Sequence, residues 1–318
     1  MKTLVIVLAE TRAVELTFQS FKENLLDRLD ADLCVCIGVK PDYDYENPFY
    51  KHAKYKFLYN EPDDYGPAFE GAYREIRKNA PSIEEYTDEN GNFQQKSPLY
   101  WREFLKIPWQ YMGGIKDPHH EHPGSAGILI FFRWFLLQKL QEHNLISQYD
   151  RFIITRSDYI YQLPHVKLSE LDENYIWVPD EEHYGGITDR HTVLSKSNIV
   201  PYLSLFHCMV LRSNEYFNKM AYHNRWNLEQ LIQFHLKQNG LLEYVREFPY
   251  VMYTVRPTNG VSRWRWGNYS EQHGYFIKYE TEYKKSSQYK TDFENSGMSI
   301  DKFYKSCIKT SSNENKQK

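Results

Sequence analysis

The N-terminal segment places an apolar strand, an amphipathic helix and a second apolar strand in succession, and this order constrains the fold more than any other feature. Leu4–Ala9 is apolar at every position, which is typical of a parallel strand buried on both faces. Apolar residues then recur at helical spacing over 14–29, and Leu33–Gly38 forms another apolar run. A strand–helix–strand opening predicts an α/β fold with a mixed, mostly parallel central sheet flanked by helices.

Two phosphate-binding motifs that often follow a strand of such a Rossmann-like sheet are missing. The loop after the first strand reads Glu10-Thr11-Arg12 and has no G-x-G-x-x-G fingerprint, which argues against a dinucleotide-dependent dehydrogenase. The chain contains no G-x-x-x-x-G-K-[ST] sequence, so a P-loop kinase is also disfavoured. The formal net charge of −3 argues against a general nucleic-acid binder, which needs an excess of Lys and Arg to displace counterions from phosphates.

The apolar stretches are too short for a signal peptide or a membrane span. The first run ends at Ala9, and the longest run, Ala126–Leu137, is interrupted by Arg133. We therefore expect no transmembrane segment and a cytoplasmic location.

A later apolar strand ends close to an acidic residue. Arg151–Thr155 is predicted as a strand, and Arg156-Ser157-Asp158 follows it. Ligands of open α/β sheets bind at the carboxyl ends of the strands. A carboxylate at that edge can hold Mg²⁺ or Mn²⁺, which would bridge a diphosphate and stabilise the charge on a leaving group. The alternative is an aspartate that only caps a turn after a strand.

A loop rich in acids and glycine, Glu181–Arg190, follows the next predicted strand. Gly185 and Gly186 allow the backbone to approach a ligand closely. Asp189 beside them is a candidate to bind sugar hydroxyls or to accept a proton from an acceptor. The alternative is an ordinary glycine turn with solvated acids.

Two charged residues on predicted helices are further candidates. Glu229 lies in the first turn of a helix predicted over 227–238, where the helix dipole favours a carboxylate even without a function. Arg133 interrupts the apolar helix predicted over 125–143, and a buried arginine needs an anionic partner. That partner is a diphosphate or Asp158 in the functional interpretation, and an internal salt bridge in the structural one.

The order of these motifs resembles glycosyltransferases of the A-type (GT-A) fold. The resemblance rests on the Glu10-Thr11-Arg12 loop, the strand ending in Thr155-Arg156-Ser157-Asp158, and the segment Tyr184–Arg190. It is greatest to the viral and bacterial enzymes that decorate surface glycans, including those of large algal viruses. It covers residues 1–260 in layout and only these short motifs in detail.

This resemblance implies a glycosyltransferase of the EC 2.4 class, located in the host cytoplasm if the enzyme is viral. It would move a hexose from a nucleoside-diphosphate sugar, with UDP-sugar favoured, to a glycan acceptor in glycan biosynthesis. In the A-type fold an Asp-x-Asp motif holds Mn²⁺ or Mg²⁺ and the donor diphosphate. Only the last acid of that motif is present here, so Asp158 inherits the metal role while Arg156 pairs with phosphate or with an acid. An acid near the start of a late helix often serves as base in this fold, which adds Glu229 to Asp189 as a catalytic candidate.

The segment Arg256–Gly267 mixes arginine and tryptophan, which suit phosphate groups and the flat faces of sugars or bases. We interpret it as a flap over the donor diphosphate, with Arg263 as a contact. RNA binding uses the same residue types, but the net charge argues against it. The predicted donor-binding residues are therefore Ala9, Glu10, Thr11, Arg12, Arg133, Arg156, Gly185, Gly186 and Arg263.

We expect one nucleotide-sugar-binding catalytic domain over 1–260, an extension packing on it over 261–309, and a disordered tail over 310–318. Within the domain, the polar residues 81–98 predict an irregular excursion. Two other functions remain open. A nucleotidyltransferase that makes sugar nucleotides would need a Gly-rich, basic loop after the first strand, and a non-catalytic carbohydrate-binding module would use the 27 Tyr and 7 Trp side chains.

Overall fold

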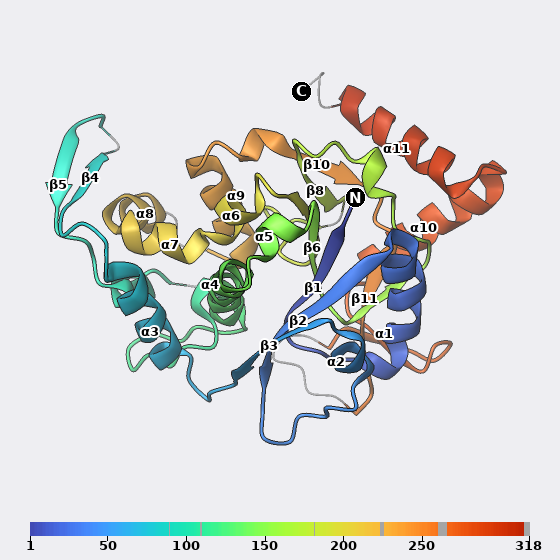
Figure 1. The fold of residues 1–318 in the computed structure, drawn as a ribbon, viewed down its shortest axis with the longest axis horizontal. Coiled ribbons are helices and arrows are strands. Elements are labelled where there is room, and N and C mark those ends of the chain that lie inside the picture. Colours follow the sequence, from blue (N-terminus) through green and yellow to red (C-terminus); the bar gives the residue numbers. More distant parts are fainter. Residues whose placement is uncertain (89, 109, 181, 223–225, 260–265, 315–318) are drawn as a thin grey trace.

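The main sheet of the protein has seven strands in the order β10-β8-β9-β6-β1-β2-β3 (Figure 1). The computed structural model describes residues 1–88, 90–108, 110–180, 182–222, 226–259 and 266–314. All neighbouring strands of this sheet are parallel except β9, which is antiparallel to both β6 and β8. The predicted α/β fold with a mixed, mostly parallel sheet is confirmed. The strands are β1 (Thr3–Ala9), β2 (Ala31–Val39), β3 (Tyr55–Asn60), β6 (Arg151–Thr155), β8 (Ile176–Pro179), β9 (Thr192–Ser195) and β10 (Val245–Phe248).

A smaller antiparallel sheet joins the segment after β6 to the C-terminal part of the chain. Its strand order is β12-β13-β11-β7, so residues from both sides of the predicted boundary at 260 share one sheet. Because β7 begins three residues after β6 ends, this sheet lies directly beside the loop that carries Asp158. The strands are β7 (Tyr159–Tyr161), β11 (Met252–Arg256), β12 (Asn268–Ser270) and β13 (Tyr275–Ile277).

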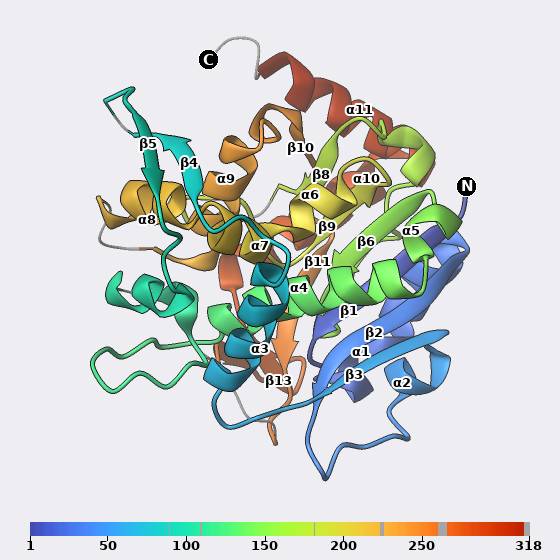
Figure 2. The ribbon, with the colours of Figure 1, turned by 60° about the vertical axis from the view of Figure 1, so that its left-hand side comes forward.

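Helices cover both faces of the main sheet (Figures 1 and 2). The long apolar helix α4 lies across one face with α3, α6, α7 and α9 beyond it, while α1, α10 and α11 lie on the other side. The helices are α1 (Val14–Phe21), α2 (Pro48–His52), α3 (Gly66–Arg77), α4 (Ala126–Glu142), α5 (Leu145–Gln148), α6 (Ile199–Leu203), α7 (Leu205–Leu211), α8 (Ser213–Ala221), α9 (Leu228–Gln238), α10 (Glu280–Ser296) and α11 (Ile300–Glu314). Short 3-10 turns are η2 (Trp101–Lys106), η3 (Gln110–Met112), η4 (Leu168–Glu170) and η5 (Leu242–Tyr244).

The apolar strands contribute side chains to two hydrophobic cores, one on each face. Leu4 and Ile6 of β1 point toward α4, whereas Val5 and Val7 point toward α1 and belong to the other core. This alternation follows from the two-residue period of a strand. Burial on both faces explains why these strands are apolar at every position.

Three expectations about elements differ from the structure. The helix predicted over 14–29 is α-helical only to Phe21 and continues as a π-helix, η1 (Lys22–Asp27). Helix α11 extends to Glu314, past residue 310, where we expected a tail to begin. The excursion over 81–98 contains a hairpin of β4 (Glu84–Thr87) and β5 (Phe93–Lys96) that projects from the body (Figure 1).

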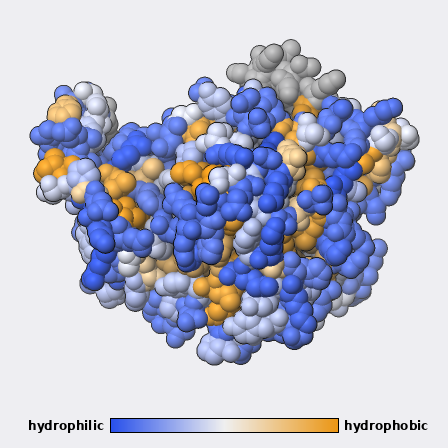
Figure 3. Space-filling model, viewed as in Figure 1, coloured by the Kyte–Doolittle hydropathy of each residue, from blue (hydrophilic) through white to orange (hydrophobic). Residues whose placement is uncertain are grey.

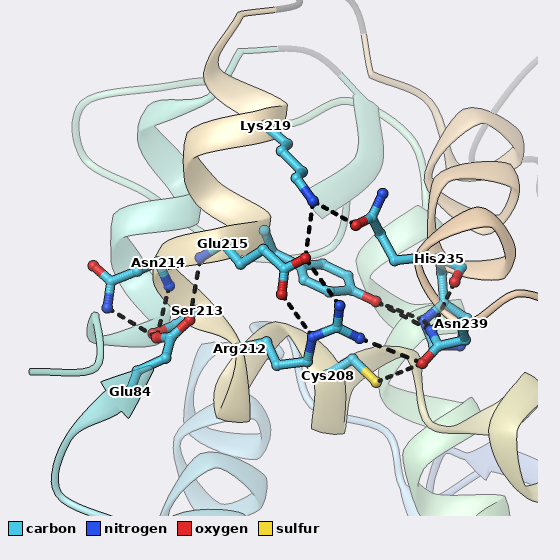
Figure 4. A network of polar contacts seen from close by, with 11 residues as sticks. Glu84, Cys208, Arg212, Ser213, Asn214, Glu215, Lys219, His235 and Asn239 are labelled. Carbon is cyan, nitrogen blue, oxygen red and sulfur yellow. Dashed lines mark hydrogen bonds and ion pairs between the residues drawn. The ribbon is translucent and has the colours of Figure 1, made fainter. Parts of the chain in front are cut away.

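A buried carboxylate anchors this hairpin to helix α8 (Figure 4). Glu84 is 5% exposed and accepts hydrogen bonds from the backbone N–H groups of Asn214 and Glu215, at 2.9 and 3.1 Å, and from the hydroxyl of Ser213 at 2.9 Å. The first N–H groups of a helix lack partners within the helix. Glu84 therefore caps α8 from a distant part of the sequence.

The outer surface is mostly polar. Figure 3 shows one face as predominantly hydrophilic, with small hydrophobic patches separated from one another. In the described part of the chain no helix combines the length and the apolar character needed to cross a membrane.

Candidate active site

The loops that follow β1 and β6 lie side by side at the carboxyl end of the main sheet. The two strands are adjacent and parallel, with Val7 opposite Thr155, so both loops leave the sheet at the same edge. They line a cavity together with helix α4 and the residue that follows β13. Ligands of open α/β sheets bind at this edge. The charged residues in the cavity wall are Glu10, Arg12, Glu61, Arg156, Asp158, Asp189 and Lys278.

Ser157 in the second loop holds the first loop in shape. Its buried hydroxyl accepts a hydrogen bond from the backbone N–H of Arg12 at 2.8 Å and lies 3.3 Å from the carbonyl oxygen of Glu10. Ala9 has a left-handed backbone conformation with φ of 72°, which turns the chain away from the direction of β1. Ala9, Glu10 and Arg12, all predicted to bind donor, therefore reach the cavity wall in a fixed arrangement.

Thr11, another predicted donor-binding residue, does not extend this wall. The hydroxyl of Thr11 lies 3.0 Å from both the hydroxyl of Tyr43 and the amide nitrogen of Asn47, so it secures the loop. Arg263 lies outside the described residues.

Asp158 is buried at the cavity wall and bound by arginine side chains. Its side chain is 1% exposed. Nε and Nη2 of Arg156 donate to its two oxygens at 2.8 and 2.7 Å, Nη1 of Arg256 donates to Oδ2, and Nε of Arg12 lies 3.9 Å from Oδ2. Burial by itself raises the pKa of this carboxyl, but Arg156 and Arg256 outweigh burial and hold the pKa well below its usual range.

These surroundings do not fit the predicted role of Asp158 as a metal ligand. Three hydrogen bonds from guanidinium groups already occupy most of the acceptor positions of the carboxylate. A cation placed beside it would also be repelled by each guanidinium, by about 4 kcal/mol per pair of unit charges at 4 Å in an effective dielectric of about 20. Across the described ranges, no group of three or more His, Cys, Asp or Glu side chains is placed to hold a metal ion.

Lys278 is the cationic residue common to three adjoining hollows of this region. It directly follows β13 and lines the cavity at the β1 and β6 loops, a second hollow beside Asp189 and Glu229, and a third of about 700 Å³ beside Trp266. Burial, followed by repulsion from neighbouring arginines, lowers the pKa of Lys278 to about 6. An anion bound beside Lys278 would raise this pKa and favour the charged ammonium form. The three hollows share wall residues and therefore adjoin one another, and we refer to them together as the cleft.

The two predicted catalytic acids, Asp189 and Glu229, line the same hollow of this cleft. Burial, followed by repulsion from Asp189, raises the pKa of Glu229 to about 7, although Arg190 and Arg133 act in the opposite direction. A carboxyl with a pKa near neutrality is suited to accept a proton during a reaction. The structure therefore brings the two acids together at one end of the cleft.

Arg133 supports this acidic end from within the protein. Its side chain is 1% exposed, and its Nη2 donates to the backbone carbonyl oxygen of Asp189 at 3.2 Å. The hydrogen bonds of Arg133 among the described residues therefore go to backbone carbonyl oxygens, those of Leu129 and Asp189, and not to Asp158. Arg133 fixes the backbone that carries Asp189 and contributes positive charge near Glu229.

The glycine pair packs against helix α9. A Cβ atom added to Gly186 would lie 2.1 Å from the carbonyl carbon and oxygen of Glu229, and the next N–H, of Ile187, donates to that same oxygen at 3.0 Å. Gly185 has φ of +79°, a conformation that glycine adopts without strain. The close backbone approach predicted for Gly185 and Gly186 is present, but it is made to the helix that carries Glu229.

A capping box fixes the start of α9 and hence the position of Glu229. The side chain of Asn227 accepts from the backbone N–H of Gln230 at 2.8 Å, and the side chain of Gln230 accepts from the N–H of Asn227 at 3.1 Å. The backbone N–H groups of Asn227 and Gln230, which lack acceptors within the helix, each thereby gain one. Glu229 in the first turn is held rigidly beside the loop of Asp189.

The sequence places Arg256 at the start of the proposed flap over the donor diphosphate, but it gives no separate role to Lys278 or Ser157. Arg256 is the last residue of an apolar strand and Lys278 directly follows another, and residues at strand ends are the signal that identified Asp158. The place of Lys278 in the cleft depends on β13 pairing with β11, which sequence spacing does not reveal.

Comparisons with known proteins add little to this description. No family model matches the sequence, and no curated protein is similar to it. Among solved structures, the apo form of mouse xyloside xylosyltransferase 1 is similar, with a TM-score of 0.36 and 8% sequence identity over 78% of this chain and 85% of that chain. A likeness at this level carries no argument about fold or activity, so both rest on the sheet order and on the cleft.

Proposed function

We propose that the protein is a glycosyltransferase that moves a hexose from a nucleoside-diphosphate sugar to a glycan acceptor. The observation that carries this proposal is the meeting of basic and acidic side chains in one cleft. Arg156, Lys278 and Asp189 line the hollow at the strand ends, and all three also line the hollow that Glu229 lines. Arg156 and Lys278 suit a diphosphate, and Glu229 suits an acceptor hydroxyl that must lose a proton.

The basic and the acidic side chains of the cleft act on different groups in the reaction. The bond between the anomeric carbon and the diphosphate oxygen breaks, and Arg156 and Lys278 stabilise the charge on the departing diphosphate. The acceptor oxygen forms the new bond to the anomeric carbon, and its proton passes to Glu229. Asp189 raises the proton affinity of Glu229 and is placed to bind sugar hydroxyls.

The order of the sequence motifs, through their resemblance to A-type enzymes, favours a UDP-sugar as donor. A nucleotidyltransferase is less consistent with the cleft, because the loop over Ala9–Arg12 has no glycine-rich cradle for a triphosphate. A carbohydrate-binding module would have no need of the buried arginines beside Asp158.

A thermal-shift panel of UDP-, GDP- and CMP-sugars tests the proposal, because a ligand that binds only the folded state raises its stability. We expect one nucleoside-diphosphate sugar to raise the melting temperature, and we expect that compound to support transfer to glycan acceptors. Glu229→Gln should keep the thermal shift and lose transfer. If the panel leaves the melting temperature unchanged while glycans alone raise it, the protein is a binding module.

A further inference from the structure

We propose that the cleft holds the diphosphate of its donor directly through a cationic cluster organised by Asp158, without a bridging divalent cation. This inference rests on the proposed function, because it states how the donor of that reaction is bound. The cationic cluster consists of Arg12, Arg156, Arg256 and Lys278 around the carboxylate of Asp158. It replaces the metal site that the sequence predicted at the same carboxylate.

The carboxylate of Asp158 is committed to orienting arginines. Arg156 binds it through two parallel hydrogen bonds of 2.8 and 2.7 Å, which fixes the plane of that guanidinium. Arg256, which is also 1% exposed, donates to Oδ2 from the strand β11. Asp158 thus holds one side chain from its own loop and one from β11, a positioning role that a bound metal would disrupt.

The arginines of the cluster are not neutralised by the carboxylates beside them. Three guanidinium groups, those of Arg12, Arg156 and Arg256, face two carboxylates, those of Asp158 and Glu10. Nε and Nη2 of Arg256 are buried and have no hydrogen-bond partner in the described part of the chain. A buried, partly uncompensated positive charge favours an anion in the adjacent cavity.

Lys278 supplies a further donor that faces the ligand space. No carboxylate of the described residues forms an ion pair with it, whereas the three lysines of the helix that follows, Lys284, Lys285 and Lys290, each form one. Lys278 lines the cavity with Arg12 and Arg156, so three basic side chains reach the space where a diphosphate would lie. Bidentate guanidinium and ammonium donors are the groups that proteins use for phosphate oxygens.

The acids of the cavity wall are Glu10, Glu61, Asp158 and Asp189. Glu10 forms an ion pair with Arg12 at 2.5 Å and its side chain is 39% exposed, and Asp158 is paired with Arg156 and Arg256. Asp189 also lines the hollow with Glu229, where the acceptor is expected. Within this cavity, Arg156 and Lys278 are the side chains against which the anion would lie.

Titration calorimetry on protein dialysed against EDTA tests the inference, with UDP, GDP, CMP and inorganic pyrophosphate as probes. We expect the preferred nucleoside diphosphate to bind in EDTA with a dissociation constant within about twofold of the value in Mn²⁺ or Mg²⁺. In parallel, electron paramagnetic resonance of Mn²⁺ should show no ion bound by the protein–nucleotide complex beyond what the nucleotide alone binds.

Substitutions of lysine distinguish a specific role of the cationic cluster in nucleotide binding from a general effect of the protein's charge. Lys278→Met, which keeps the length of the side chain, should weaken nucleotide binding by about tenfold in EDTA and equally in Mn²⁺. Lys278→Arg should restore most of that loss. The matched control is Lys284→Met, which removes an exposed lysine of α10 paired with Glu280 and should leave binding unchanged. Circular dichroism of each variant establishes that it is folded.

The outcomes distinguish this inference from the function on which it rests. If the nucleotide binds only with Mn²⁺, or if Mn²⁺ tightens binding by about tenfold or more, the metal-free assignment is overturned and the transferase proposal stands. If Lys278→Met binds as the parent does in both buffers, the cationic cluster is not the diphosphate site. If no nucleotide or pyrophosphate binds with or without metal, both proposals fall.

Discussion

Glu229 combines two properties that a general base needs, a fixed position and a proton affinity near the working pH. The capping box at Asn227 and Gln230 provides the first. Burial and the charge of Asp189 provide the second by raising the pKa of Glu229 to about 7. An isolated glutamate at a helix start is favoured in its ionised form. The raised pKa of Glu229 therefore depends on its burial and on the neighbouring Asp189.

This pair makes a prediction about the pH dependence of transfer. The value of kcat/KM should rise as pH increases through about 7, because only the ionised carboxylate of Glu229 accepts a proton. Asp189→Asn removes the repulsion between the acids, so the midpoint of the remaining activity should move to lower pH. Glu229→Gln should reduce kcat by about 10²–10⁴-fold. Initial rates between pH 5 and pH 9 measure all three effects.

Glu243→Gln is the matched control, since this glutamate lies exposed in the short turn after α9. It should leave the profile unchanged. A midpoint that stays in place in Asp189→Asn, or normal turnover in Glu229→Gln, would assign the base to another group.

At the scale of elements, the sequence predicts best where a single physical requirement dominates. Burial on both faces makes the central residues of β1 and β6 apolar, and both strands begin and end within a residue of their predicted bounds. The sequence does not predict the hairpin β4–β5, because its strands are mostly polar and it is held by Glu84 contacting α8. The acidic end of the cleft was predicted because its residues follow strands or start a helix, but the pairing of β13 with β11 that places Lys278 is not encoded in local spacing.

Gly186 connects two elements of the acidic end, and its substitution tests that connection. Gly186→Ala would place a Cβ atom 2.1 Å from backbone atoms of Glu229, which cannot move without shifting α9. We expect a loss of about 1–3 kcal/mol in the free energy of unfolding and a large loss of transfer activity. Gly71→Ala is the control, because it lies in α3 with no atom within 4 Å of the added Cβ. Denaturant unfolding should show the control at or slightly above parental stability.

Glu84 provides a second test at this scale, because one side chain holds a hairpin on a helix. Glu84→Ala removes hydrogen bonds to Ser213, Asn214 and Glu215, and we expect it to destabilise the protein by about 2–3 kcal/mol. Glu84→Gln keeps the shape and loses the charge, so it should cost about 1 kcal/mol. Hydrogen exchange should accelerate at the first amides of α8.

The neighbouring Glu85, which is exposed and bonds only with Gln95 among the described residues, is the control for this effect. Its replacement by Ala should change stability by less than about 0.5 kcal/mol. Unchanged exchange in Glu84→Ala would mean that α8 does not depend on the hairpin for its cap.

At the scale of the whole molecule, a buried chain of polar groups joins the cleft to the core on the α1 side of the sheet. Nδ1 of His165 donates to the carbonyl oxygen of Val166 at 2.7 Å, which leaves Nε2 of His165 to accept from Nε2 of His191 at 3.2 Å. Nδ1 of His191 then accepts from the hydroxyl of Thr155, 2.9 Å away, which lines the cavity. Every donor in this chain meets an acceptor only while both imidazoles are neutral.

This series of hydrogen-bonded histidines makes the stability of the folded protein sensitive to acid. Burial lowers the pKa of His165 to about 4 and also lowers the pKa of His191. The unfolded chain binds a proton as pH falls through about 6.5, whereas the folded chain binds it only near pH 4. The stability contributed by neutral His165 is therefore fully present above pH 6.5 and is lost between pH 6.5 and 4, by about 3 kcal/mol.

Glu229 acts in the opposite direction, since its raised pKa means that the folded state gains stability as pH falls from about 7 toward 4.5. The total pH dependence is thus shallower than the two histidines together would give, and a comparison of variants separates the contributions. His165→Asn should be less stable than the parent at pH 7 but should lose less stability between pH 6.5 and 4. His119→Asn, in an exposed loop, should keep the parental dependence. Urea unfolding across this range measures the difference, and parallel curves for the parent and His165→Asn would mean that the imidazole chain does not control acid stability.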